Sequence, residues 1–228
     1  MQPRQSPEPV AAATGNFTWR TSDDFASAFA VHRSVMQGAP AGLVRPDPLC
    51  HFENHIHRDG CLLACMHDAQ TMVGYGILGI DSPMATHLAD LLGTDPALFA
   101  ILDGAAALPQ WRGYGLHQQA IGERIACAAA RGRSLIGATV SPSNLRAMHS
   151  LFQAGFSIRG YALMYGGLER LLVLRDTLAP APAQQGVAVR VAATDAGAHR
   201  AALASGLAGL DLFRDAGGHW SVGYGPAS

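Results

Sequence analysis

The sequence predicts a mixed α/β fold, in which a central sheet that is antiparallel at first and parallel later is flanked by helices. Apolar strand patterns alternate with amphipathic helix patterns along most of the chain. Their order is strand, two helices and several strands, then strand, helix, strand, helix and strand, which is typical of helices packed on a mixed sheet. The 228 residues suffice for one sizeable core, or for one domain with an appendage.

The first half of the chain starts with a tail and continues with regular elements. Residues 1–15 are rich in Pro, Ala and polar residues, which predicts a flexible tail. The elements that follow are a strand, a helix after a Ser/Asp cap, a short helix and a hairpin with its turn at 69–70. Their ranges are 16–22, 22–36, 46–60, and 61–68 with 71–80.

The second half alternates strands and helices. Residues 82–98 carry a short helical pattern with proline near both ends, and we interpret them as an insertion, either a lid or a plain surface segment. A helix over 115–131 is expected to end at Gly132, and one over 141–156 to be capped by Ser141 or Ser143. The strands are expected at 99–109, 134–140, 157–166 and 168–176.

A linker rich in Pro, Ala and Gln divides the chain at 178–186. It separates a main domain, 16–177, from a C-terminal extension, 187–228, with a strand and a helix. About forty residues are too few for an independent core. The extension is therefore expected to pack on the main domain or on a second copy of the chain, as a homodimer.

Composition and charge exclude several classes of partner. The formal net charge is −1, and 14% of the residues are charged, so no basic field favours nucleic acid or an anionic membrane. The sequence has neither a long apolar run typical of a membrane span nor a signal-peptide pattern. Its four cysteines form no disulfide-like framework, which indicates a cytoplasmic protein.

Two glycines precede the helix at 115–131, in the stretch "QWRGYGL". One interpretation is a tight turn that needs positive φ. The other is a phosphate cradle, because the first amides of a helix lack internal partners and its dipole favours an anion.

Two motifs resemble the GNAT superfamily of acyl-CoA-dependent N-acyltransferases. "PQWRGYGL" resembles its pyrophosphate loop, and "NLRAMHSLFQAGF", which begins 29 residues after Gly115, resembles its second signature. The resemblance covers roughly residues 16–175. It implies a GNAT-like fold, acetyl-CoA as co-substrate, and direct attack of an amine in a ternary complex. The low charge favours a small-molecule amine over a histone-like or nucleic-acid-bound acceptor.

The resemblance also implies which residues bind the cofactor. The amides of the loop would face the pyrophosphate, and Asn144 would bond the pantetheine arm. Two positions depart from the family pattern: His117 replaces a small residue, and Leu151 replaces the tyrosine thought to protonate the leaving thiolate. The cofactor-binding candidates are Ala107, Leu108, Arg112, Gly113, Tyr114, Gly115, Leu116, His117 and Asn144.

A catalytic base is needed because an ammonium group must lose a proton before it attacks a thioester. By resemblance, Asp103 lies where the family places a carboxylate. Glu53, His55 and His57 are the alternatives, because the second helix borders the acceptor cleft in that fold. The loss of the tyrosine leaves a second function open, a non-catalytic acyl-CoA-binding module.

Histidines and cysteines also cluster in "CHFENHIHRDGCLLAC". Such side chains bind zinc, and metal-assisted hydrolysis would follow from a metal site. The spacing matches neither a two-histidine helix motif nor a Cys-x-x-Cys ribbon. We therefore expect no metal. The residues concerned are His51, His55, His57, Glu53, Cys61 and Cys65.

Overall fold

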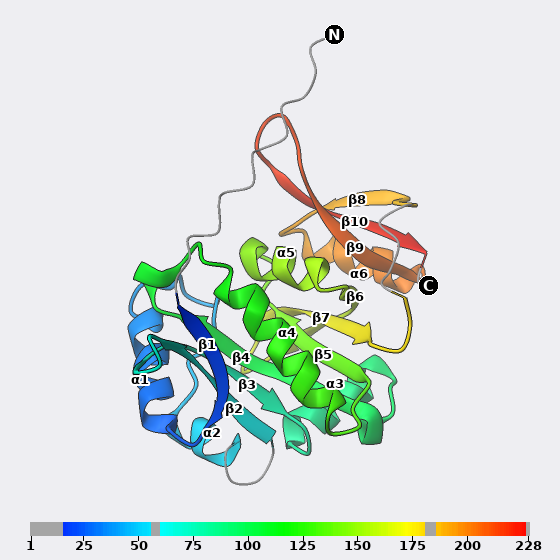
Figure 1. Cartoon of the computed structure of the whole chain (residues 1–228). Helices are drawn as coiled ribbons and strands as arrows, with labels where there is room; N and C mark the ends of the chain where they lie inside the picture. Colours follow the sequence, from blue (N-terminus) through cyan, green and yellow to red (C-terminus); the bar gives the residue numbers. More distant parts are fainter. Residues whose placement is uncertain (1–15, 56–59, 181–185, 227–228) are drawn as a thin grey trace.

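One sheet runs through the part of the chain that the computed structural model describes, residues 16–55, 60–180 and 186–226 (Figure 1). Its strand order is β1-β2-β3-β4-β5-β7-β6-β9-β10-β8. The β4–β5 pair is parallel, and the other pairs are antiparallel. The predicted mixed α/β class is therefore confirmed.

Every strand that the sequence predicts for the main domain is present in the structure. The strands are β1 (Phe17–Ser22), β2 (Gly60–His67), β3 (Thr71–Gly79), β4 (Phe99–Ala107), β5 (Leu135–Val140), β6 (Ser157–Met164), β7 (Leu168–Asp176), β8 (Val189–Ala192), β9 (Leu207–Arg214) and β10 (Trp220–Pro226). The α-helices are α1 (Phe25–Met36), α2 (Leu49–Asn54), α3 (Pro83–Leu92), α4 (Leu116–Ala129), α5 (Leu145–Gln153) and α6 (Ala196–Ala204).

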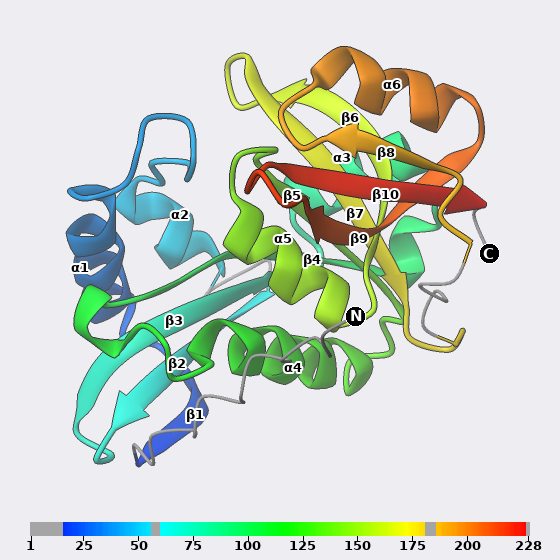
Figure 2. The same ribbon diagram turned by 90° about the horizontal axis from the view of Figure 1, so that it is seen from above.

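Neighbouring residues of each central strand pack on opposite faces of the sheet, because side chains alternate along a strand. Leu63, Leu78 and Leu102 share an apolar cluster with residues of α4 and α5. Leu62 and Ile77 pack with α1 and α2. Helices α4 and α5 thus cover one face, and α1 and α2 cover the other (Figure 2).

Residues 82–98 are neither a lid nor a plain surface segment, so the interpretation as an insertion of that kind was wrong. Ser82 caps α3 by accepting a hydrogen bond from the amide of Ala85. Ala85 and Leu88 are buried in a cluster with Phe99 of β4. Helix α3 therefore belongs to the core on the α1–α2 face.

Two local expectations were also wrong. Helix α5 is capped by Asn144, whose Oδ1 accepts from the amide of Ala147 at 3.2 Å. The hydroxyls of Ser141 and Ser143 bond to each other instead, at 2.9 Å. The β2–β3 turn starts one residue earlier than expected, because Asp68 and Ala69 both adopt positive φ and β2 ends at His67.

The extension continues the sheet of the main domain. Strand β9 pairs with β6 through Gly209 and Ile158. Val222 and Tyr224 of β10 belong to the same apolar cluster as Ile158. Strands β9 and β10 were not expected, because their glycine-rich sequence weakens the strand pattern. No helix in the described ranges has the length and apolar character needed to cross a membrane.

Candidate functional site

Strands β4 and β5 separate part-way along their length. They pair only from Phe99 to Ile101 and from Leu135 to Gly137. Beyond that point, a cavity of about 150 Å³ lies between residues 102–105 of β4 and 138–141 around the end of β5. This volume has room for reacting groups, so a larger ligand must extend out of it along the split.

A β-bulge in β4 lies at this split. Two residues, Asp103 and Gly104, stand opposite Ile77 of β3, and Gly104 has φ +102°. The buried Arg124 of α4 donates from Nη1 to the carbonyls of Ile77 (3.3 Å) and Gly104 (3.0 Å). Sequence periodicity missed Arg124, which lies on the buried face of α4 because the bulge supplies these acceptors.

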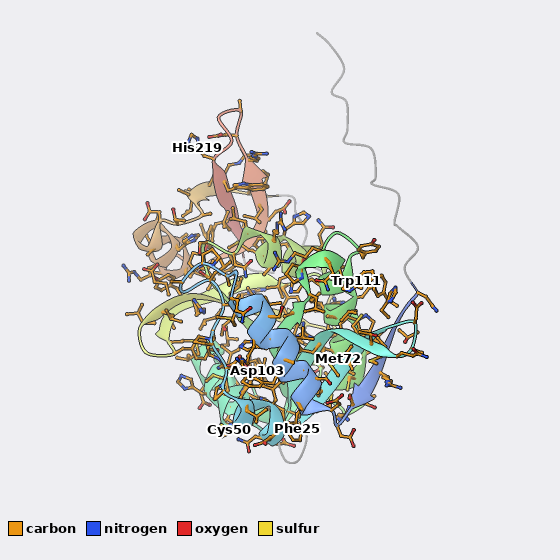
Figure 3. All side chains as sticks on the ribbon, turned by 90° about the vertical axis from the view of Figure 1, so that its left-hand side faces the viewer. Phe25, Cys50, Met72, Asp103, Trp111 and His219 are labelled. Atoms are coloured by element: carbon orange, nitrogen blue, oxygen red, sulfur yellow. The ribbon has the colours of Figure 1, made fainter. Side chains whose placement is uncertain are left out.

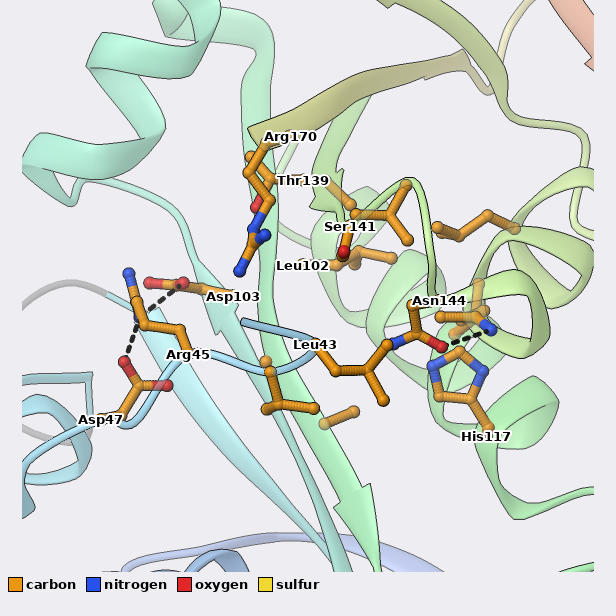
Figure 4. Close-up of a pocket in the computed structure, with 18 of the residues that line it drawn as sticks. Leu43, Arg45, Asp47, Leu102, Asp103, His117, Thr139, Ser141, Asn144 and Arg170 are labelled. Atoms are coloured by element: carbon orange, nitrogen blue, oxygen red, sulfur yellow. Dashed lines mark hydrogen bonds and ion pairs between the residues drawn. The ribbon is translucent and has the colours of Figure 1, made fainter. Parts of the chain in front are cut away.

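The gap between β4 and β5 connects the two faces of the sheet. Leu102 and Val140 pack toward α4 and α5, so the alternation of side chains directs Asp103 and Thr139 to the opposite face. Figure 4 shows this division, with His117 and Asn144 at one end of the cavity and Asp103, Arg45 and Asp47 at the other. One cavity therefore joins the α4–α5 side to the α1–α2 side.

The glycines before α4 have the conformation that the sequence suggested. Gly113 has φ +90° and Gly115 has φ +71°, where Gly115 is the N-cap of α4. A Cβ at Gly113 would meet no atom within 4 Å, so backbone conformation rather than crowding requires glycine there. The backbone amide of Gln119 donates to the carbonyl of Gly115 at 3.0 Å. The amides before Gln119 stand at the open end of the helix.

Aromatic contacts fix this loop on the β1–β2 edge. Trp111 packs against Phe17 (5.5 Å between ring centroids) and His67 (4.3 Å), and Tyr114 packs against Phe17 (5.3 Å). Gln119 Nε2 donates to the carbonyl of Tyr114 at 3.3 Å. The loop is therefore held in place before any ligand binds, and Arg112 is exposed beside it.

Only some of the predicted cofactor residues line the cavity. Asn144 and His117 do, as does Leu151 at the position of the missing tyrosine. Burial and the nearby charge of Arg124 lower the pKa of His117 to about 4, so the imidazole is neutral at pH 7. Leu116 is buried under the loop.

Ala107 and Leu108 lie at the end of β4 and are not among the cavity-lining residues. Ala107 pairs with Gly74 of β3. The amide of Leu108 donates to the carbonyl of Val73 at 2.9 Å.

Asp103 is the centre of a buried polar cluster. Its Oδ2 accepts from Nε2 of His55 at 3.0 Å, and its Oδ1 accepts from Nη2 of Arg45 at 3.2 Å. Burial alone would raise the pKa of the Asp103 carboxyl, but the hydrogen bond from His55 and the charge of Arg45 lower it below its usual value. Asp103 is therefore ionised at neutral pH.

Residues that sequence reasoning missed surround Asp103. Arg45 also forms an ion pair with Asp47, and its guanidinium lies over the ring of Tyr165, 4.5 Å from the centroid. The hydroxyl of Tyr165 bonds Thr139 Oγ1 at 3.0 Å. Arg45 and Asp47 precede α2 in an irregular segment, where no periodic pattern marks a buried side chain.

The other predicted bases differ in position. A second cavity, bordered by His51, Arg45 and Tyr165, lies beside the first. Glu53 lies on α2 and lines neither of the two cavities. His57 lies outside the described residues. Figure 3 shows Asp103 in the same half of the molecule as Cys50 of α2, and His219 at the far tip of the β9–β10 hairpin.

His51, His55 and Asp103 have ligand atoms within 4.8 Å of one another. Arg45 Nη2 lies 3.1 Å from His51 Nε2 and 3.2 Å from Asp103 Oδ1. A metal ion would therefore have to displace a guanidinium group. Cys61 and Cys65 lie on β2, and Cys61 Sγ is 3.0 Å from that of Cys127; neither thiol belongs to the cluster.

Comparison with known proteins finds no matching family model and no matching curated protein. Solved structures do match. A protein from Salmonella typhimurium, described as an acetyltransferase and solved with acetyl-CoA, is 15% identical, with 75% of this chain and 99% of that chain covered at a TM-score of 0.54. A GCN5-related N-acetyltransferase (GNAT) from Kribbella flavida is 16% identical, with 70% and 97% covered and a TM-score of 0.53. The chain has the GNAT fold.

A third match is the diaminobutyrate acetyltransferase of Paenibacillus lautus, solved with its substrate and coenzyme A. It is 15% identical, with 72% of this chain and 97% of that chain covered and a TM-score of 0.53. The resemblance of the two motifs to the GNAT superfamily is therefore confirmed at the level of the fold.

Proposed function

We propose that this protein is an acyl-CoA-dependent N-acyltransferase that transfers an acetyl group to an amine of a small molecule. The observation that carries the proposal is the continuous cavity through the split sheet. It joins Asn144 and His117 on the α4–α5 side to the ionised Asp103 on the α1–α2 side. Two substrates could enter from opposite faces and meet between β4 and β5.

The α4–α5 side suits coenzyme A. The amides of residues 113–117 and the dipole of α4 favour a pyrophosphate, and Arg112 adds a positive charge. Beyond the split, the facing backbones of β4 and β5 no longer bond each other, so they can bond the amides of the pantetheine arm. Asn144 uses Oδ1 for the helix cap, which leaves its NH₂ group to donate to the same arm.

The α1–α2 side suits the amine. An ammonium group gives one proton to Asp103, directly or through a water molecule, and its nitrogen then attacks the thioester carbonyl carbon. The new C–N bond forms as the C–S bond breaks. The nitrogen loses its second proton, so that one proton ends on the coenzyme A sulfur and one in solvent.

The leaving thiolate meets positive charge rather than a tyrosine. Leu151 is apolar and lines the cavity, but so does Arg124, which carries a positive charge. Nearby cations stabilise a thiolate. We therefore propose that the thiolate leaves without a dedicated acid.

The test is release of free coenzyme A thiol from acetyl-CoA, measured with a panel of small amines and amino acids. Some acceptors should give turnover, and the rate should rise with pH as the amine loses its proton, without an alkaline fall. A panel without turnover would overturn the proposed reaction.

Leu151 favours the second candidate, a non-catalytic acyl-CoA-binding module. It predicts that calorimetry detects acetyl-CoA binding while no acceptor gives turnover. Measuring both quantities on one preparation decides between the two functions.

A further inference from the structure

The cavity holds more positive than negative charge. Arg45, Arg124 and Arg170 line it, whereas its carboxylates are Asp47 and Asp103. Arg45 pairs with both of these carboxylates. Among the described residues, neither Arg124 nor Arg170 has a carboxylate within ion-pair distance.

The contacts of the Arg124 side chain explain why this buried cation is present, whereas those of Arg170 do not. Arg124 donates to three backbone carbonyls around the β4 bulge. Arg170 is only 4% exposed, and the one hydrogen bond of its side chain in the described structure runs from Nη1 to the carbonyl of the adjacent Glu169 at 2.8 Å. Burial lowers the pKa of Arg170, which reflects the cost of a cation that lacks a compensating anion.

Arg170 points into the cavity. Figure 4 shows its guanidinium group directed into the space beside Asp103, Thr139 and Ser141. The group also lies 5.7 Å from the centre of the Tyr165 ring, which Arg45 contacts at 4.5 Å. A planar guanidinium held in this way presents paired N–H groups that match a carboxylate.

The position of Arg170 assigns it to the acceptor. Leu171, its neighbour on β7, packs toward α4 and α5, so Arg170 lies on the α1–α2 face with Asp103. His117 and Asn144, where coenzyme A is proposed to bind, lie at the other end of the cavity. An acceptor amine at Asp103 would therefore carry its second polar group toward Arg170.

We propose that the acceptor is an amino acid, an amine that also bears a carboxylate, and that Arg170 binds this carboxylate. The inference rests on the proposed acetyl transfer and narrows its substrate class. Arg170 fixes which amines enter, and Asp103 takes the proton.

The experiment compares each amino acid with its carboxamide, which keeps the amine and lacks the negative charge. With acetyl-CoA, kcat/KM should be at least about 30-fold higher for the acid, as expected for a buried charge-assisted pair. In Arg170→Gln this ratio should fall to near 1, and Arg170→Lys should give an intermediate ratio. Arg190→Gln, which removes one exposed positive charge on β8, should leave the ratio unchanged.

The ratio separates recognition from a folding defect, because a damaged fold lowers kcat/KM for acid and carboxamide alike. Equal values for both in the wild type would overturn the carboxylate site but not acetyl transfer. A preference for succinyl-CoA over acetyl-CoA that disappears in Arg170→Gln would also overturn it, by assigning Arg170 to the acyl group. If no amine gives turnover, acetyl transfer fails. Calorimetry of the same acid and carboxamide pairs on the coenzyme A-loaded protein then tests the carboxylate site by itself.

Discussion

Asp103 Oδ2 lies 3.0 Å from His55 Nε2, a contact that joins β4 to the end of α2 across 48 positions of sequence. It holds the carboxylate at the split in the sheet. Asp103→Asn should lower kcat about 100-fold or more, because an amide cannot accept the amine proton. The Kd for acetyl-CoA should change little, since the base acts on the nucleophile. Steady-state kinetics with calorimetry measures both.

Glu53→Gln is the matched control, since it makes the same chemical change on α2 at a residue that does not line the cavity. It should leave kcat within about twofold, as expected for a group outside the reacting geometry. Unchanged turnover in Asp103→Asn together with a large loss in Glu53→Gln would move the base to α2.

Gly113→Pro and Gly115→Asp should each abolish acetyl-CoA binding in calorimetry. Proline cannot adopt the φ of +90° found at Gly113 and lacks the amide. Aspartate at Gly115 adds a negative charge beside the pyrophosphate. Gly122→Ala on the exposed side of α4 is the control, with binding retained and stability raised by about 0.5–1 kcal/mol. Binding retained in both loop variants would remove the loop from the cofactor site.

Purified protein should contain no stoichiometric zinc, because Arg45 already contacts His51 and Asp103 in the cluster that could hold an ion. Elemental analysis measures this directly. About one zinc per chain, lost in the double variant His51→Ala and His55→Ala, would contradict the prediction and reopen metal-assisted hydrolysis.

Stability should fall as the pH drops below about 6.5. The buried His32 bonds Tyr75 through Nδ1 at 2.8 Å and accepts from the amide of Asp47 through Nε2 at 3.1 Å. Burial lowers its pKa below the usual 6.5, so the unfolded chain binds the proton first and acid favours unfolding. The lowered pKa values of His51, His117 and His199 act in the same direction.

Urea unfolding between pH 7 and pH 4.5 checks this prediction. His32→Gln should unfold at a lower urea concentration and show a weaker pH dependence, whereas His149→Gln on the exposed side of α5 should resemble the wild type. A free energy of unfolding that is constant over this pH range would contradict the role given to the buried histidines.

Truncation after Thr177 should cause aggregation or lower Tm by about 10 °C or more. It removes the buried Val191, Val222 and Tyr224 from the cluster that contains Ile158, and each buried side chain of this size contributes about 1.5–3 kcal/mol. Deleting residues 1–15 is the control and should leave Tm unchanged. A truncated chain with unchanged solubility, mass in solution and turnover would show that the extension is dispensable.

The regular elements of the main domain could be predicted because each carries its own local pattern. Asp24 caps α1 through the amide of Ser27, and Gly132, with φ +74°, lies in the turn that follows α4, both as local chemistry requires. The α5 cap was predicted wrongly at Ser141 or Ser143, because these residues and Asn144 all have capping side chains. In the structure it is Asn144 Oδ1 that accepts from the amide of Ala147.

The candidate site was predicted in part. Asp103, His55, His117 and Asn144 were among the predicted residues, His117 and Asn144 from the two motifs and Asp103 and His55 from their positions in the fold that these motifs resemble. Arg45, Tyr165 and Arg170 were not. Arg45 lies in an irregular segment, Tyr165 in a turn with positive φ, and Arg170 beside Glu169 on β7, where a charged pair gives no sign of burial.

By itself, the sequence determined the order of strands and helices in the main domain, the glycine conformations before α4 and the fold family that its two motifs resemble. Those features depend on neighbouring residues, so local patterns record them. The tertiary structure alone decided that β4 and β5 separate after Ile101, that the bulge places Asp103 beside His55, and that Arg170 lies buried with no carboxylate partner among the residues that the structure describes. Each of these depends on contacts between residues far apart in the chain, where burial and charge act through space and leave no periodic signal in the sequence.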